Sequence, residues 1–182
     1  MIVCVFFVFQ RKDFRENFSC NSININEILD RLKDINENII QFNVVEKDVP
    51  GIPSEGTNIK SFYDKKDNSL VLVEVSSFAS IARYFTKYYV QNGDIYFIES
   101  ITDEWDLKKL HGESGELSLS EGKYVVGTST KEQYVVVYKK LCEYIAERPR
   151  IASVAVTKSD PEKDLQRLME MYQFISNEMR LM

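Results

Sequence analysis

The stretch that most constrains the fold runs from Ala79 to Ile101, ASIARYFTKYYVQNGDIYFIESI, and is divided by Asn92-Gly93. A type I′ turn needs a positive φ at both of its central residues, and Asn followed by Gly accepts this backbone conformation. Alternating apolar and aromatic residues flank the pair. We therefore expect a β-hairpin in which the strands Ser80 to Val90 and Asp94 to Ile101 pair antiparallel.

On the N-terminal side of this hairpin the sequence also alternates with a period of two. Ile59 to Tyr63 and Leu70 to Val75 are predicted strands, separated by the polar turn Lys65 to Asn68. Strands joined by short turns usually pair with their neighbours in sequence, so we expect these four strands to form an antiparallel meander. Lys123 to Thr128 and Ile151 to Val156 are candidates for further strands.

Amphipathic helices are predicted near both ends of the chain. Residues 25 to 41 follow a capping residue, Ser22 or Asn24, and carry apolar side chains at helical spacing. Asp160-Pro161 begins the second helix, because Asp caps helices and Pro fits the first helical position. We expect the apolar stripes of these helices to cover one face of the sheet.

A third helix is predicted over residues 131 to 147. Thr130 and Gln133 stand at the spacing of a capping box, and the apolar residues beyond them fall on one helical stripe. The β-branched run Val135-Val136-Val137 leaves a strand as the alternative. Between the hairpin and this segment, residues 102 to 119 follow no clear period and are predicted to be irregular.

Together these elements predict an α+β fold, an antiparallel β-meander of about four to six strands packed by N-terminal and C-terminal amphipathic helices. The chain has 182 residues and no linker rich in Pro, Gly or Ser, so residues 21 to 182 are expected to form a single domain. Its 28 acidic and 23 basic residues give a net charge of −5. Such a chain lacks the positive field that attracts nucleic acid, and we expect no nucleic acid partner.

Residues 1 to 20 have two interpretations. The apolar run MIVCVFFVF is too short to span a membrane but matches the apolar region of a signal peptide in size. It also suits a buried strand, Ile2 to Phe9, and the basic residues Arg11 and Lys12 follow the run instead of preceding it. We favour export, which places the protein in the periplasm, the envelope or the medium rather than the cytoplasm. Membrane contact would then come only from the signal or from a lipid anchor.

The three cysteines Cys4, Cys20 and Cys142 bear on the same question. Ser19 precedes Cys20 as a small residue does at a lipoprotein cleavage site, which makes Cys20 a candidate for lipidation. Three irregularly spaced cysteines do not make a disulfide framework, and no pair has the spacing of a zinc or redox motif. We therefore expect isolated thiols.

The sequence contains no glycine-rich phosphate loop, metal-ligand spacing or nucleophile elbow. The best catalytic candidate is the loop His111 to Glu116, which holds a base, two carboxylates and a hydroxyl. An ordinary polar loop explains the same residues. The acidic residues Asp103, Glu104 and Asp106 lack the regular spacing of a calcium loop. We assign no catalytic residue, metal ligand or cofactor.

Aromatic residues form the more informative pattern. Five of them lie on the two strands of the predicted hairpin: Tyr84, Tyr88, Tyr89, Tyr96 and Phe97. If the helices leave them uncovered, they form a stacked face suited to a protein partner or a planar ligand. If the helices cover them, they belong to the core.

The segment Tyr88-Tyr89-Val90-Gln91-Asn92-Gly93-Asp94-Ile95 follows the N-terminal helix, the break at Pro50 to Gly56 and the strand Ile59 to Tyr63. Over about Ile25 to Ile101 this order resembles a group of small uncharacterised bacterial exported proteins, often lipoproteins. Their chains carry a tyrosine-rich strand, Asn-Gly and an apolar strand in the same arrangement. The resemblance implies export, and it implies no activity or catalytic residues.

The sequence supports three functional hypotheses. The preferred one is a non-catalytic binding or inhibitory module of the bacterial envelope that holds a protein partner on its aromatic sheet face. The second is a cytoplasmic immunity or adaptor protein whose acidic surface binds a basic partner. The third is a hydrolase that uses the loop around His111.

Overall fold

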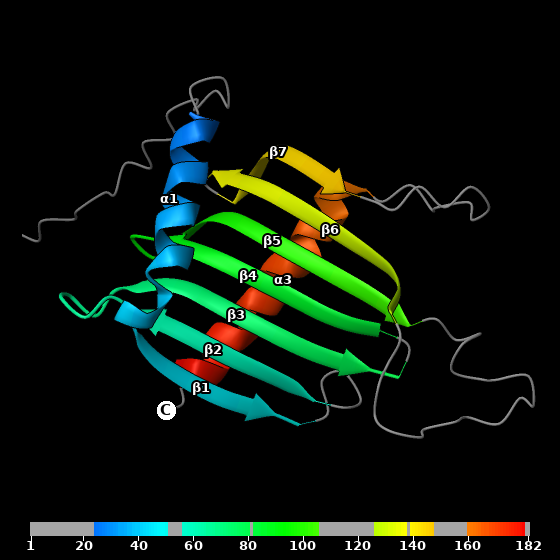
Figure 1. Ribbon diagram of the computed structural model, residues 1–182, viewed down its shortest axis with the longest axis horizontal. Coiled ribbons are helices and arrows are strands. Elements are labelled where there is room, and N and C mark those ends of the chain that lie inside the picture. The colour runs from blue at the N-terminus through cyan, green and yellow to red at the C-terminus, as the bar shows by residue number, and fades with distance from the viewer. Residues whose placement is uncertain are drawn as a thin grey trace, which may run out of the picture.

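The computed structural model describes residues 24–50, 56–80, 82–105, 126–137, 139–147 and 160–180. They form a seven-stranded antiparallel sheet in which the strands β1 to β7 follow one another in sequence order. The helices α1 and α3 pack on opposite faces of this sheet (Figure 1). The predicted α+β meander with a helix from each end of the chain is therefore confirmed. The sheet has seven strands rather than the four to six expected.

The two helices begin where the sequence predicts. The elements in chain order are α1 Ile25–Glu37, the 3₁₀ turn η2 Ile39–Gln41, β1 Asn43–Val49, β2 Thr57–Tyr63, β3 Leu70–Ala79, β4 Ala82–Gln91, β5 Asp94–Trp105, β6 Val126–Val137, β7 Lys140–Glu147 and α3 Pro161–Arg180. The Asn24 side chain accepts a hydrogen bond from the backbone N–H of Glu27 at 3.4 Å. Asp160 accepts one from the N–H of Glu162 at 3.2 Å. Each cap satisfies an N–H group that the first turn leaves without a helical partner.

The β4–β5 hairpin turns at Asn92-Gly93 as predicted. The backbone has φ of 53° at Asn92 and 85° at Gly93, the left-handed conformation that a type I′ turn requires. A Cβ placed on Gly93 would meet no atom within 4 Å. Glycine therefore suits this position because of its backbone conformation and not because space is short.

The prediction of a helix over residues 131 to 147 is wrong, because this segment lies in the hairpin formed by β6 and β7. Val135 and Val136 are both buried, at 3% and 1% exposed, because neighbouring side chains of a strand point to opposite faces and each face is covered by a helix. Burial on both faces removes the alternation of polar and apolar residues that marks a strand in the sequence.

The register shift between β6 and β7 passes over Cys142 of β7, so Leu141 and Tyr144 lie three residues apart on the same face. Lys139 takes the turn with φ of 64°, where neither Asn nor Gly signals it.

The edge strand β1 is not among the strands predicted from the sequence. β1 pairs antiparallel with β2 along all seven of its residues. β5 runs on to Trp105, inside the region expected to be irregular, and β6 begins at Val126, within the segment predicted as a fifth strand. The predicted strand Ile151 to Val156 and residues 1 to 20 lie outside the described residues.

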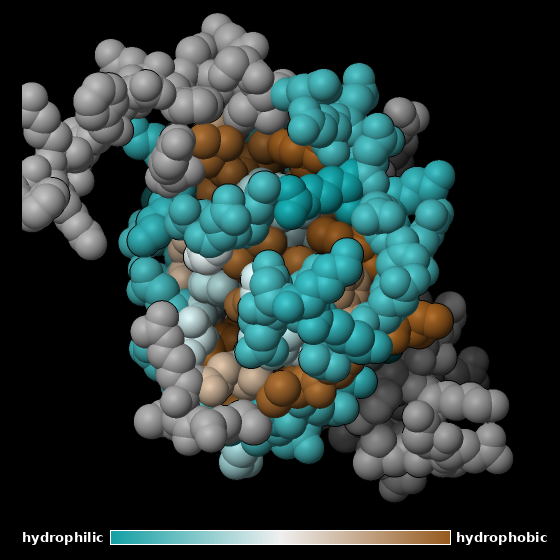
Figure 2. Space-filling model, turned by 90° about the vertical axis from the view of Figure 1, so that its left-hand side faces the viewer, coloured by the Kyte–Doolittle hydropathy of each residue, from teal (hydrophilic) through white to brown (hydrophobic). Residues whose placement is uncertain are grey.

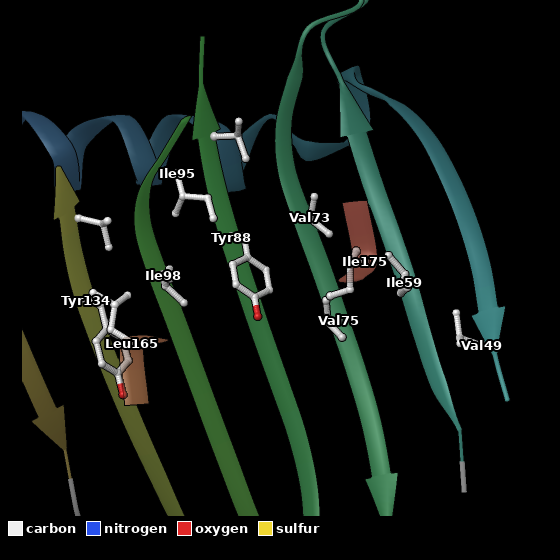
Figure 3. Packing of buried hydrophobic residues seen from close by; sticks show 12 residues of the cluster. Val49, Ile59, Val73, Val75, Tyr88, Ile95, Ile98, Tyr134, Leu165 and Ile175 are labelled. Atoms are coloured by element: carbon white, nitrogen blue, oxygen red, sulfur yellow. The ribbon is translucent and has the colours of Figure 1, made fainter. Parts of the chain in front are cut away.

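Two apolar layers hold the helices to the sheet. On one face, Leu32 and Ile35 of α1 pack on a row of sheet residues, Phe62, Leu72, Tyr89, Phe97 and Val135. On the other face, Leu165 and Ile175 of α3 pack on a second set that includes Ile59, Val75, Tyr88, Ile98 and Tyr134 (Figure 3). The helices thus cover opposite faces and not one face as expected. Figure 2 shows the molecule from the end of the sheet beside α1. Hydrophobic residues are visible there between hydrophilic ones.

Candidate binding surface

The five predicted aromatic residues do not form one surface. Tyr88 faces α3 whereas Tyr89 and Phe97 face α1, and each of the three is at most 2% exposed. Tyr96 is half-buried on the α1 side, and Tyr84 is 39% exposed on the α3 side. Neighbouring side chains of a strand point to opposite faces, so Tyr88 and Tyr89 cannot share a patch. Four of the five residues pack within the protein, and Tyr84 lies at its surface.

A row of alternating charges crosses the α1 face beside the apolar layer. The residues paired from strand to strand are Glu46, Lys60, Glu74, Lys87 and Glu99, and we call them the charge row. The Lys87 and Glu74 side chains lie 3.0 Å apart, and Glu99 lies 2.7 Å from Lys131 of β6. Opposite charges on paired strands stabilise a sheet by about 0.2–1 kcal/mol per pair. The row therefore helps to fix the register of β1 to β5.

Asn36 connects α1 to this row. Its Oδ1 accepts a hydrogen bond from Lys87 Nζ at 3.1 Å, and its Nδ2 donates to the Tyr89 hydroxyl at 3.0 Å. Burial raises the pKa of Tyr89 to about 12, and the hydrogen bond with Asn36 offsets only part of this effect. The hydroxyl is therefore neutral at physiological pH and can donate as well as accept.

Beyond the charge row, on the side away from α1, lies a part of the sheet that we call the distal surface. It consists of five side chains from β3 to β6: Phe78, Arg83, Phe85, Asp103 and Ser129. None of them belongs to the two core clusters of the described residues. Phe78 is 41% exposed, and no described helix lies in front of this end of the sheet (Figure 1). The distal surface is the candidate binding site.

Asp103 organises the polar part of the distal surface. Its Oδ2 accepts hydrogen bonds from Nε and Nη2 of Arg83, and its Oδ1 accepts one from the Ser129 hydroxyl at 2.7 Å. Burial by itself would raise the pKa of Asp103, but the hydrogen bonds from Ser129 and Arg83 and the charge of Arg83 outweigh it and lower the pKa. The carboxylate stays ionised and fixes the guanidinium of Arg83, the residue that lies opposite Phe78 on the paired strand.

Alternation along β4 places Arg83 and Phe85 on one face, but no feature of the sequence marks Asp103 as their neighbour. Counting back from the Asn92-Gly93 turn would place Arg83 opposite Thr102. The register shifts by one residue between Tyr89 and Val90, which brings Asp103 opposite Arg83 instead. A bulge of this kind leaves no reliable mark in the sequence.

The opposite face of the same end of the sheet carries hydroxyl groups. One residue from each of five neighbouring strands contributes to this row: Thr57, Ser77, Tyr84, Thr102 and Thr130. The Thr57 and Ser77 hydroxyls lie 2.8 Å apart, and both residues are buried. This hydroxyl row is uncharged, in contrast with the distal surface.

The candidate metal and catalytic residues lie partly within the described part of the chain and partly outside it. Among them, no group of three or more His, Cys, Asp or Glu side chains could hold a metal ion. Asp103 pairs with Arg83, and Glu104 accepts a hydrogen bond from Thr128 at 3.0 Å. The loop His111 to Glu116, Asp106 and the lipidation candidate Cys20 lie outside the described residues, so these assignments stay predictions.

Cys142 differs from the expectation of isolated thiols, because it is disulfide-bonded. It lies on β7, partly buried against the apolar layer under α1. The other two cysteines lie outside the described residues. Disulfides persist mainly in oxidising compartments, so this bond bears on where the protein works.

Comparison with protein-family models, with curated proteins and with solved structures finds no match for this chain. Function is therefore inferred from the surfaces of the molecule. Within the part of the chain that the structure describes, neither helix has the length and apolar character needed to cross a membrane.

Proposed function

We propose that this chain is a non-catalytic binding or inhibitory module of the bacterial envelope that holds a protein partner on its distal surface. The observation that carries the proposal is the exposed Phe78 ring, 41% accessible, beside an arginine fixed by Asp103. Aromatic and arginine side chains are enriched where protein interfaces concentrate their binding energy. The preferred surface differs from the five residues expected from the sequence.

Rigidity supports this choice of surface. Phe78 and Arg83 lie directly opposite each other on paired strands, and Arg83 is held by Asp103 on the next strand. Side chains that are already ordered lose little conformational entropy when a partner binds. The surface also combines an apolar ring with a charged group, as protein interfaces commonly do.

The disulfide at Cys142 supports placement in the envelope, since reducing compartments rarely preserve such bonds. The second candidate, a cytoplasmic immunity or adaptor protein with a basic partner, is favoured by the net charge of −5. Cell fractionation distinguishes the two. Envelope or secreted protein supports the first candidate, and protein confined to the cytoplasm supports the second.

Affinity capture with quantitative mass spectrometry tests the binding surface. Phe78→Ser should lose the captured partner, whereas Phe174→Ser should retain it. Phe174 is a matched control because it is 40% exposed, close to the 41% of Phe78, but lies on α3. Equal capture by both variants would contradict the proposal, provided that thermal unfolding shows both to be folded.

A further inference from the structure

Among the strands that the structure describes, β1 lies at the edge of the sheet and pairs regularly on its inner side alone. The strands of the sheet follow the linear order β1 to β7, so among the described strands β1 has only β2 as a neighbour. The β1–β2 register continues through seven residue pairs without a shift, whereas the β6–β7 register shifts at Val135. An edge strand presents unpaired backbone N–H and C=O groups to which another extended chain can bind.

The side chains of β1 make this edge acidic. Glu46 and Asp48 lie on the α1 face, and the Asn58 amide donates hydrogen bonds to them at 2.8 Å and 2.9 Å. Lys60 lies 3.5 Å from Glu46 and compensates part of its charge. Asn58 holds the two carboxylates in place without neutralising either.

The single basic residue of β1 does not oppose this charge. Lys47 lies on the α3 face, where its Nζ is 3.0 Å from the Glu178 carboxylate and 2.9 Å from the Glu178 carbonyl oxygen. Its charge is therefore compensated within the protein. A strand that added to β1 would meet two carboxylates on one face and an already neutralised pair on the other.

We propose that β1 binds an extended basic segment of a partner protein by strand addition, with Lys or Arg at alternate positions of that segment opposite Glu46 and Asp48. Side chains on one face of a strand recur at every second residue, so two carboxylates two residues apart require basic residues two apart. Backbone hydrogen bonds would supply affinity and the charge spacing would supply selectivity. This interface is separate from the distal surface and goes beyond the proposed function.

The same charges select against a second copy of this chain. Two β1 strands related by a two-fold axis through Glu46 would place Glu46 opposite Glu46. An axis through Lys47 would place Glu46 opposite Asp48. Like charges facing each other on paired strands are destabilising. The acidic edge therefore disfavours these self-pairings and favours a basic strand.

Two synthetic peptides of equal composition test the proposal on the full chain. One alternates Lys and Thr, and the other carries its Lys residues in one block followed by its Thr residues. Fluorescence anisotropy at low salt should show that the alternating peptide binds about tenfold more tightly, a ratio that corresponds to about 1.4 kcal/mol. Equal affinity for the two peptides, or no binding of the alternating one, would overturn strand addition.

Charge reversal supplies the matched variants. Glu46→Lys with Asp48→Lys should weaken binding of the alternating Lys peptide and create binding of an alternating Glu peptide. Glu162→Lys with Glu170→Lys makes the same change of net charge on exposed positions of α3 and should leave both affinities nearly unchanged. Equal loss in the two double variants would show that net charge alone attracts the peptide and would refute the proposal. A negative result in these peptide experiments would not affect the capture experiment with Phe78→Ser, because the two experiments change different surfaces of the protein.

Discussion

Tyr88 and Tyr89 are adjacent in β4, yet their side chains are buried under different helices and differ in hydrogen bonding. The Tyr88 ring packs on Tyr172 of α3 with the ring centroids 5.2 Å apart, and its hydroxyl has no hydrogen-bond partner among the described residues. The Tyr89 hydroxyl contacts Asn36 of α1 at 3.0 Å. Two neighbouring tyrosines thus anchor two helices in different ways.

Removing each hydroxyl should therefore change the free energy of unfolding differently, with a loss expected only at Tyr89. Tyr88→Phe deletes a buried group that makes no hydrogen bond and should leave the free energy of unfolding unchanged or raise it by about 1 kcal/mol. Tyr89→Phe breaks the contact with Asn36 and should lower it by about 1 kcal/mol. Urea unfolding measures both. A larger loss for Tyr88→Phe than for Tyr89→Phe would contradict the described packing.

The ion pair of the distal surface predicts a specific pH dependence. Asp103 has a pKa below its ordinary value of 3.8, so the folded state favours the ionised carboxylate. The resulting stability is present above the pKa of the unfolded chain and is lost as the pH falls through the folded pKa. Asp103→Asn should cost about 1 kcal/mol at neutral pH, a modest value because Arg83 is partly exposed to solvent.

Unfolding curves from neutral pH down to about pH 2 test this prediction, since that range covers the usual titration of aspartate. The stability difference between the natural protein and Asp103→Asn should shrink as the pH falls. A difference that stays constant over this range would show that the hydrogen bonds do not depend on the charge of Asp103.

Most of the central sheet follows from the sequence because its cues are local. Asn92-Gly93 fixes one turn, and alternation along the flanking strands separates the side chains of the two faces. The helices begin at Asn24 and Asp160, whose side chains accept the hydrogen bonds expected of caps. In each case, residues close together in sequence determine the structure.

The remaining parts depend on contacts between distant residues. Lys47 interrupts the apolar side of β1, and its partner Glu178 lies 131 residues away, so nothing local marks this strand. The register shift at Val135 and the positive φ of Lys139 likewise disguise the last hairpin as a helical stripe. The distal surface could not be predicted either, because a register shift brings Asp103 opposite Arg83.

Because Cys142 is disulfide-bonded, unreduced protein should contain fewer free thiols than the same protein after reduction. Thiol titration of denatured protein measures this, and peptide mapping without reductant identifies the partner cysteine. A bond to Cys20 would exclude lipid on that sulfur, and a bond to Cys4 would show that residues 1 to 20 remain on the mature chain. Three free thiols in unreduced protein would contradict the bond at Cys142.

The most direct measurement of the binding function is photo-cross-linking in cells from a benzophenone amino acid placed at residue 78 or at residue 174. The two positions are similarly exposed aromatic residues on different elements. We expect residue 78 to form one reproducible protein adduct that residue 174 does not form, and Arg83→Ala should reduce it. The same adducts from both positions, or no protein adduct from residue 78, would contradict a partner bound on the distal surface.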